Sequence, residues 1–109
     1  MFIQIVQARG SRRDEIRDLI LFRRDAIGQP TGWLGKTFGF TDDDEFIAVV
    51  RFESCEAAMA NSNSAAQRAF AERMGALADG PVEFHDCEDV TAFFDGGSDD
   101  PAPALASRR

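Results

Sequence analysis

The alternation of apolar and polar positions along the chain predicts a small set of strands and helices. Phe46–Phe52 is the clearest strand, because apolar residues occupy both of its faces. An antiparallel strand in a small protein usually buries one face and leaves the other in water. This strand therefore needs a cover on each side of its sheet.

The first part of the chain predicts a strand followed by a helix. Phe2–Ala8 has strand composition, again with apolar residues on both sides. Apolar residues spaced by three and four then predict a helix that stops before Gly28 and Pro30. Ser11 and Asp14 resemble a capping box at the start of that helix.

A hairpin is expected in the middle of the chain, between Trp33–Thr41 and Phe46–Phe52. If Asp43 and Asp44 form the tip of the hairpin, Gly35 lies opposite Phe52. A slip of one residue in either strand would exchange the two faces. One face of the second strand would then carry Trp33, Gly35, Thr37 and Gly39.

Two helical stretches and a further strand complete the pattern. Ser54 is placed to cap a helix that the polar residues 61–64 break or kink before a second stretch, Ala65–Ala78. Val82–Cys87 is expected to be the fourth strand, and Val90–Phe94 a short fifth strand or its continuation.

The order strand, helix, strand, strand, helix, strand predicts an α+β, ferredoxin-like βαββαβ fold in residues 1–95. Right-handed crossovers place the helices on one face of the antiparallel sheet. The other face stays bare, so we expect a homodimer through that face. Residues 96–109 are rich in Gly, Ser, Asp, Pro and Ala and are expected to form a disordered tail.

Composition narrows the classes of partner. The chain has 109 residues and a net charge of −7, which argues against nucleic acid and against anionic membrane surfaces. It shows neither signal-peptide features nor a run long enough to span a membrane, so a cytoplasmic location is expected. Cys55 and Cys87 are then expected to be free thiols.

No resident metal or cofactor is expected. Two cysteines and one histidine do not make a zinc signature. The glycines between Gly35 and Gly39 lie within a predicted strand and not at a strand-to-helix turn, so they do not form a phosphate loop.

The run Phe46-Ile-Ala-Val-Val-Arg-Phe-Glu-Ser-Cys-Glu-Ala-Ala-Met-Ala resembles the third strand and following helix of the antibiotic biosynthesis monooxygenase-like family. Ala69–Arg73 also fits, and the resemblance covers roughly residues 1–95. It implies a dimeric α+β barrel. Some members of the family oxygenate polycyclic aromatic substrates without a cofactor, some degrade haem, and many have no known activity.

The resemblance also identifies departures from the family pattern. Oxygenase and haem-degrading members use an Asn on the first strand and a Trp at the end of the third, and haem degraders add a His on the second helix. Here the matching positions are Gln7 or its neighbour and Phe52, while the only histidine, His85, lies on the fourth strand. These departures disfavour haem degradation and weaken the oxygenase interpretation.

In the family, the position of Phe52 faces a pocket between sheet and helices. The resemblance and the small residues of the second strand together predict an apolar substrate-binding cavity bordered by Trp33, Gly35, Thr37, Gly39, Phe52 and Met59. The alternative is that the glycines only allow close packing.

Three polar residues are candidates for catalysis. His85 could act as a general base, Arg51 could bind an anionic substrate, and Gln7 could orient it. Each also has a structural interpretation, as a surface residue or as a partner of an acidic neighbour. Two functions stay open: a cofactor-independent monooxygenase acting on an aromatic or other apolar molecule, and a non-catalytic dimeric barrel that binds a small ligand or a protein.

Overall fold

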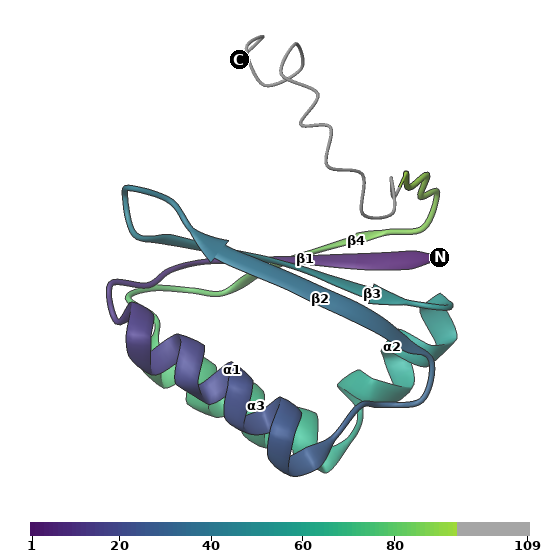
Figure 1. Ribbon diagram of the computed structural model, residues 1–109, viewed down its shortest axis with the longest axis horizontal. Helices are drawn as coiled ribbons and strands as arrows, with labels where there is room; N and C mark the ends of the chain where they lie inside the picture. Colours follow the sequence, from purple (N-terminus) through teal and green to yellow (C-terminus); the bar gives the residue numbers. More distant parts are fainter. Residues whose placement is uncertain (94–109) are drawn as a thin grey trace, which may run out of the picture.

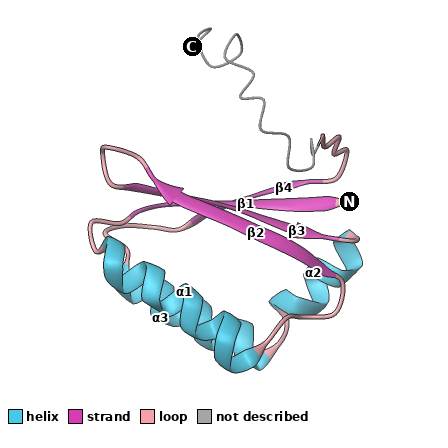
Figure 2. Ribbon diagram, in the orientation of Figure 1, coloured by secondary structure: helices cyan, strands magenta, loops and turns pink. Residues whose placement is uncertain are grey.

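The computed structural model describes residues 1–93 and contains one antiparallel sheet with helices on one face (Figures 1 and 2). The sheet has four strands in the order β2-β3-β1-β4. The elements in chain order are β1 (Phe2–Arg9), α1 (Arg13–Ile27), β2 (Trp33–Phe40), β3 (Glu45–Phe52), α2 (Cys55–Ser62), α3 (Ala65–Leu77) and β4 (Glu83–Cys87). The α+β, ferredoxin-like prediction is confirmed, including the break between the last two helices.

The register of the β2–β3 hairpin differs from the predicted one by one residue. The structure pairs Phe40 with Phe46 and Gly35 with Arg51, so Gly35 does not lie opposite Phe52. The reason is the loop, which has three residues and not two, and Asp44 closes it with a positive φ of 61°. A type I turn followed by such a left-handed residue is a common way to close a three-residue loop.

The corrected register decides which side chains of the sheet face the helices, because directly opposed residues share a face. A bulge between Trp33 and Gly35 returns Trp33 to the helix side, opposite Phe52. The helix face therefore carries Phe2, Gln4, Val6, Ala8, Trp33, Lys36, Phe38, Phe40, Phe46, Ala48, Val50, Phe52, Phe84 and Asp86. The open face carries Ile3, Ile5, Gln7, Gly35, Thr37, Gly39, Ile47, Val49, Arg51, Glu83, His85 and Cys87.

The core of the described chain consists of two clusters, both on the helix face. One joins Phe46 and Ala48 of β3 to buried residues of α1 and α3. The other joins Phe2 and Phe52 to Ala58 of α2. The two clusters pack the opposite ends of the sheet against different helices, and the space between them is where a site could form.

Local details at the helix ends are partly as expected. Ser54 caps α2, since its hydroxyl accepts a hydrogen bond from the Ala57 backbone N–H at 3.1 Å. The capping box predicted at Ser11 is wrong, because the N-cap of α1 is Arg12 and makes no side-chain cap. Instead the backbone N–H and hydroxyl of Ser11 both donate to Asp79, at 2.9 and 2.7 Å.

The end of the described chain differs from the prediction. Residues 90–93 form no strand, so the fifth strand expected over 90–94 is not present in its described part. The predicted tail, 96–109, lies outside the described residues. None of the helices within residues 1–93 is long and apolar enough to cross a membrane.

Candidate functional site

A cavity of about 480 Å³ lies between the sheet and the helices. All four strands contribute to its roof, α1 and α3 form its floor, and Asn61 of α2 closes one end. The loop at residues 28–30 forms part of the same end, where a smaller hollow of about 330 Å³ shares Arg23, Gly28, Gln29, Pro30 and Asn61 with the cavity. The space is of the size that proteins use for small molecules.

Most of the cavity wall is apolar. Trp33 and Phe52 come from one core cluster and Phe46 and Met74 from the other, so the cavity separates the two. The further apolar lining side chains are Val6, Ile20, Leu21, Pro30, Phe38, Ala48, Val50, Phe70, Ala71, Val82 and Phe84. An apolar ligand would bury surface against this wall and exclude water.

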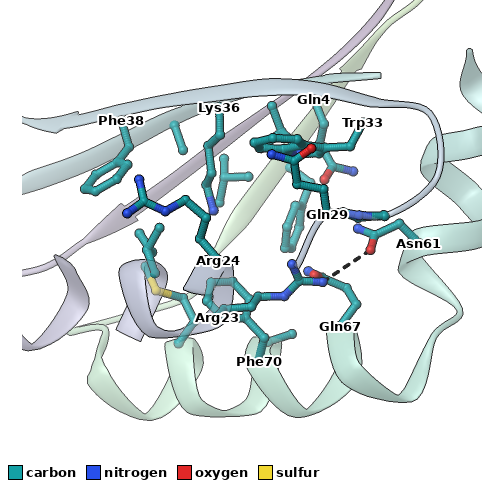
Figure 3. A pocket seen from close by; sticks show the side chains of 18 of the residues that line it. Gln4, Arg23, Arg24, Gln29, Trp33, Lys36, Phe38, Asn61, Gln67 and Phe70 are labelled. Atoms are coloured by element: carbon teal, nitrogen blue, oxygen red, sulfur yellow. Dashed lines mark hydrogen bonds between the residues drawn. The ribbon is translucent and has the colours of Figure 1, made fainter. Parts of the chain in front are cut away.

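The charged residues of the cavity are all basic. Lys36 reaches in from β2, and Arg23 and Arg24 come from α1 (Figure 3). No Asp or Glu of residues 1–93 lines the cavity, in a chain with 19 acidic and 12 basic residues. The cavity is therefore locally basic inside an acidic protein.

Arg23 has only part of its hydrogen-bonding capacity satisfied. Its Nη2 donates to Asn61 Oδ1 at 3.3 Å, and its guanidinium carbon lies 5.5 Å from the centre of the Phe70 ring. Its Nε is buried and has no acceptor among the described residues. Desolvation by burial lowers the pKa of Arg23.

Lys36 also lies near the Phe70 ring. Its Nζ is 5.1 Å from the centre of the Phe70 ring, and it forms no ion pair within residues 1–93. Burial, followed by repulsion from Arg23, lowers the pKa of Lys36 to about 8. Its ammonium is therefore the main form at pH 7 but loses its proton more readily than an exposed lysine, and a nearby negative charge would stabilise it.

The structure brings only some of the predicted binding residues to this cavity. Trp33 and Phe52 line it. Gly35, Thr37 and Gly39 lie on the open face because of the corrected register, and Met59 projects from α2 with 55% of its surface exposed. The expectation that the β2 glycines make room in the cavity is wrong, since neither Gly35 nor Gly39 lines it and both lie on the opposite face of the sheet.

The three catalytic candidates all lie on the open face of the sheet, away from the cavity. His85 pairs with Ile5, Gln7 with Glu83, and Arg51 with Gly35. Arg51 Nη1 donates to Thr37 Oγ1 at 3.2 Å, and His85 Nε2 lies 3.8 Å from a Glu83 carboxylate oxygen. Their catalytic roles stay predictions that would have to act on that face.

The sequence interpretation did not find the basic residues of the cavity. The predicted register placed Lys36 on the face of β2 away from the cavity. The helical spacing placed Arg23 on the apolar face of the first helix but gave it no role in a site, and it did not single out Arg24. A three-residue loop that ends at Asp44, a residue type that tolerates a positive φ, would have placed Lys36 inside, but the composition of the loop suits a two-residue turn equally well.

Comparisons with protein-family models and with curated protein sequences return no match. Solved structures do match. A protein from Deinococcus radiodurans described as a candidate antibiotic biosynthesis monooxygenase superposes with a TM-score of 0.72 at 15% identity, over 89% of this chain and 100% of that one. A similarly described protein from Nitrosomonas europaea gives 0.69 at 12% identity, over 84% and 100%.

A third solved structure has a named activity. It is a variant of SnoaB, a cofactor-independent oxygenase from Streptomyces nogalater, with a TM-score of 0.69 at 12% identity, over 84% of this chain and 95% of that one. The chain therefore has the fold of antibiotic biosynthesis monooxygenase-like proteins, as its sequence resemblance implied. At these identities the likeness establishes the fold and not the reaction.

Proposed function

We propose that this chain binds an apolar, aromatic small molecule between its sheet and helices and oxygenates it without a cofactor. The observation that carries the proposal is the cavity of about 480 Å³, with its mainly apolar wall. The oxygenase named among the structural neighbours has the same fold and supports the choice of reaction. An enclosed apolar wall would hold an aromatic ring system and keep water from the reacting carbon.

The reaction needs no added reductant when the substrate supplies the electrons. An acidified CH₂ group between two aromatic rings loses a proton, and the resulting carbanion reacts with O₂. One oxygen atom becomes the carbonyl of the product and the other leaves as water, so that CH₂ and O₂ give C=O and H₂O. A cation near the substrate oxygen would stabilise the carbanion as its enolate.

The test is aerobic incubation with a reduced tricyclic aromatic ketone such as anthrone. The expected result is O₂ consumption with equimolar quinone formation, above the rate with heat-denatured protein. Val50→Phe, which places a ring in the cavity, should abolish the excess rate. Met59→Phe, at an exposed position of α2 outside the cavity wall, should keep it.

The second candidate is a non-catalytic protein that binds a ligand in the same cavity. It is favoured by the first strand, where Val6 and not an Asn lines the cavity and Gln7 points to the other face, and by Phe52 in place of the family's Trp. Binding without turnover of a broad substrate panel would select this function. Absence of binding would contradict both candidates.

We further propose that the functional unit is a homodimer joined through the open sheet faces. Ile3, Ile5, Ile47 and Val49 lie on that face, and no helix of residues 1–93 covers it. The glycines of β2 leave this surface without large side chains at one edge, which would let a second sheet approach closely.

A further inference from the structure

The basic side chains of the cavity point to the chemistry of its ligand. Lys36 and Arg23 both approach Phe70, with the ammonium 5.1 Å and the guanidinium carbon 5.5 Å from the ring centre. Two cations held near one ring repel each other, and this repulsion adds to the larger effect of burial in lowering the pKa of Lys36. A negative charge placed between them would remove this repulsion.

Hydrogen bonding supports the same conclusion. The Nε of Arg23 is buried without an acceptor in the described part of the chain. A buried donor without a partner is costly, and an anionic oxygen is the acceptor that arginine binds best. Lys36 can offer its ammonium protons to the same oxygen, since it has no carboxylate within 4.0 Å among residues 1–93.

Arg24 differs from these two residues. It forms a 3.0 Å ion pair with Asp25, and more than half of each side chain is exposed. Its charge is therefore screened and already partnered, so it contributes to the rim of the cavity. The anion site is the inner pair, Arg23 and Lys36.

We propose that the cavity binds a hydrophobic monoanion, with its anionic oxygen between Arg23 and Lys36 and its ring system against Trp33, Val50 and Phe52. The proposal rests on the proposed use of this cavity for small-molecule binding and narrows it to a ligand class: aromatic carboxylates, sulfonates and ionised phenols or enols. An uncharged hydrocarbon of the same shape leaves both cations desolvated and unpaired, so it binds more weakly.

A matched pair of fluorescent probes tests the proposal. 1-Anilinonaphthalene-8-sulfonate and N-phenyl-1-naphthylamine share their rings and differ by the sulfonate, and both brighten in apolar surroundings. The expected result at pH 7 is tighter binding of the sulfonate by about tenfold or more, the effect of one charge-assisted contact. Equal affinity, or tighter binding of the neutral probe, would overturn the proposal and leave the cavity's role in binding intact.

Variants locate the effect. Lys36→Met should remove most of the preference for the sulfonate and keep or improve binding of the neutral probe. Lys36→Arg keeps the positive charge and should retain the preference. This variant therefore distinguishes loss of the charge from loss of folding. Arg17→Met serves as the control, because this residue of α1 pairs with Asp14 and does not line the cavity, and it should change the preference little. A preference that survives Lys36→Met would contradict the assignment.

The pH dependence gives a second readout. The charged groups that line the cavity together with Lys36 are Arg23 and Arg24, and the pKa of Lys36 is about 8. Sulfonate affinity should therefore fall by several-fold between pH 7 and pH 9 as Lys36 deprotonates, while the neutral probe shows no such change. Lys36→Met should abolish the fall. Failure of both probes to bind, or binding that Val50→Phe leaves unchanged, would instead contradict the proposed function.

Discussion

Asp44 adopts a left-handed backbone conformation that Asp tolerates better than most residues, and its side chain adds an ion pair. Its φ is 61°, in the left-handed region. Its Oδ1 accepts a hydrogen bond from Arg13 Nε at 2.8 Å, while Arg13 Nη2 donates to the Thr41 carbonyl at 2.8 Å. The residue therefore closes the hairpin loop and ties it to the start of α1.

Three substitutions separate these contributions. Asp44→Gly loses the ion pair and relieves the backbone, so its effect on stability should be small. Asp44→Ala also loses the ion pair but keeps a Cβ in the left-handed conformation. It should therefore be less stable than Asp44→Gly by about 1 kcal/mol, the cost of a Cβ in that conformation. Asp43→Ala is the control in the same loop. Urea unfolding measures all three, and equal stability of the Ala and Gly variants would contradict this account.

Asp79 forms a contact between the end of α3 and the start of α1 that we expect to be sensitive to acid. The side-chain and backbone hydrogen bonds from Ser11 lower its pKa. A depressed folded-state pKa gives stability that is present above the unfolded value and is lost as the pH falls through the folded value.

Asp79→Asn should therefore lower the urea midpoint at pH 7 and have less effect at pH 3, where the carboxylate of the parent is becoming protonated. Because this carboxylate is exposed, the difference should be small, and Asp86→Asn is a carboxylate control on β4. If the difference in urea midpoint between the parent and Asp79→Asn grows as the pH falls, the predicted pH dependence is contradicted.

The β2–β3 hairpin shows how far the sequence predicts the site. The observed strands and helices and their order follow from apolar spacing and from caps such as Ser54, and they were predictable within a residue or two. The fifth strand expected over 90–94 is the exception, since residues 90–93 form no strand. The loop length was not, because Asp42, Asp43 and Asp44 suit a two-residue or a three-residue turn equally well by composition. A register error of one residue then exchanges the two faces of β2, which placed the glycines inside and Lys36 outside.

The corrected faces make a prediction that the other register would reverse. Gly39→Leu should leave probe binding to the cavity unchanged, since a side chain there projects from the open face, away from the cavity. Phe38→Ala should alter binding, because Phe38 lines the cavity. Fluorescence titration of both variants decides between the registers, provided that each keeps a cooperative thermal transition.

At the scale of the whole molecule, the open face predicts association. Light scattering at micromolar concentration should give twice the mass of one chain. Val49→Glu places a charge at the centre of the proposed interface and should yield monomers, since a charge buried between two apolar sheets is strongly unfavourable. Phe22→Glu is the control, because Phe22 is an apolar side chain that is 58% exposed on α1. A monomeric parent would contradict the dimer.

The separation of the two core clusters by a cavity also sets the response of the protein to hydrostatic pressure. Pressure favours the state of smaller volume, and unfolding eliminates internal voids. The free protein should therefore unfold at a lower pressure than a variant such as Val50→Phe, in which a ring occupies part of the space. A bound ligand should raise the pressure midpoint in the same way, so high-pressure fluorescence of Trp33, the only tryptophan and a residue of the cavity wall, can detect occupancy with ligands that carry no chromophore.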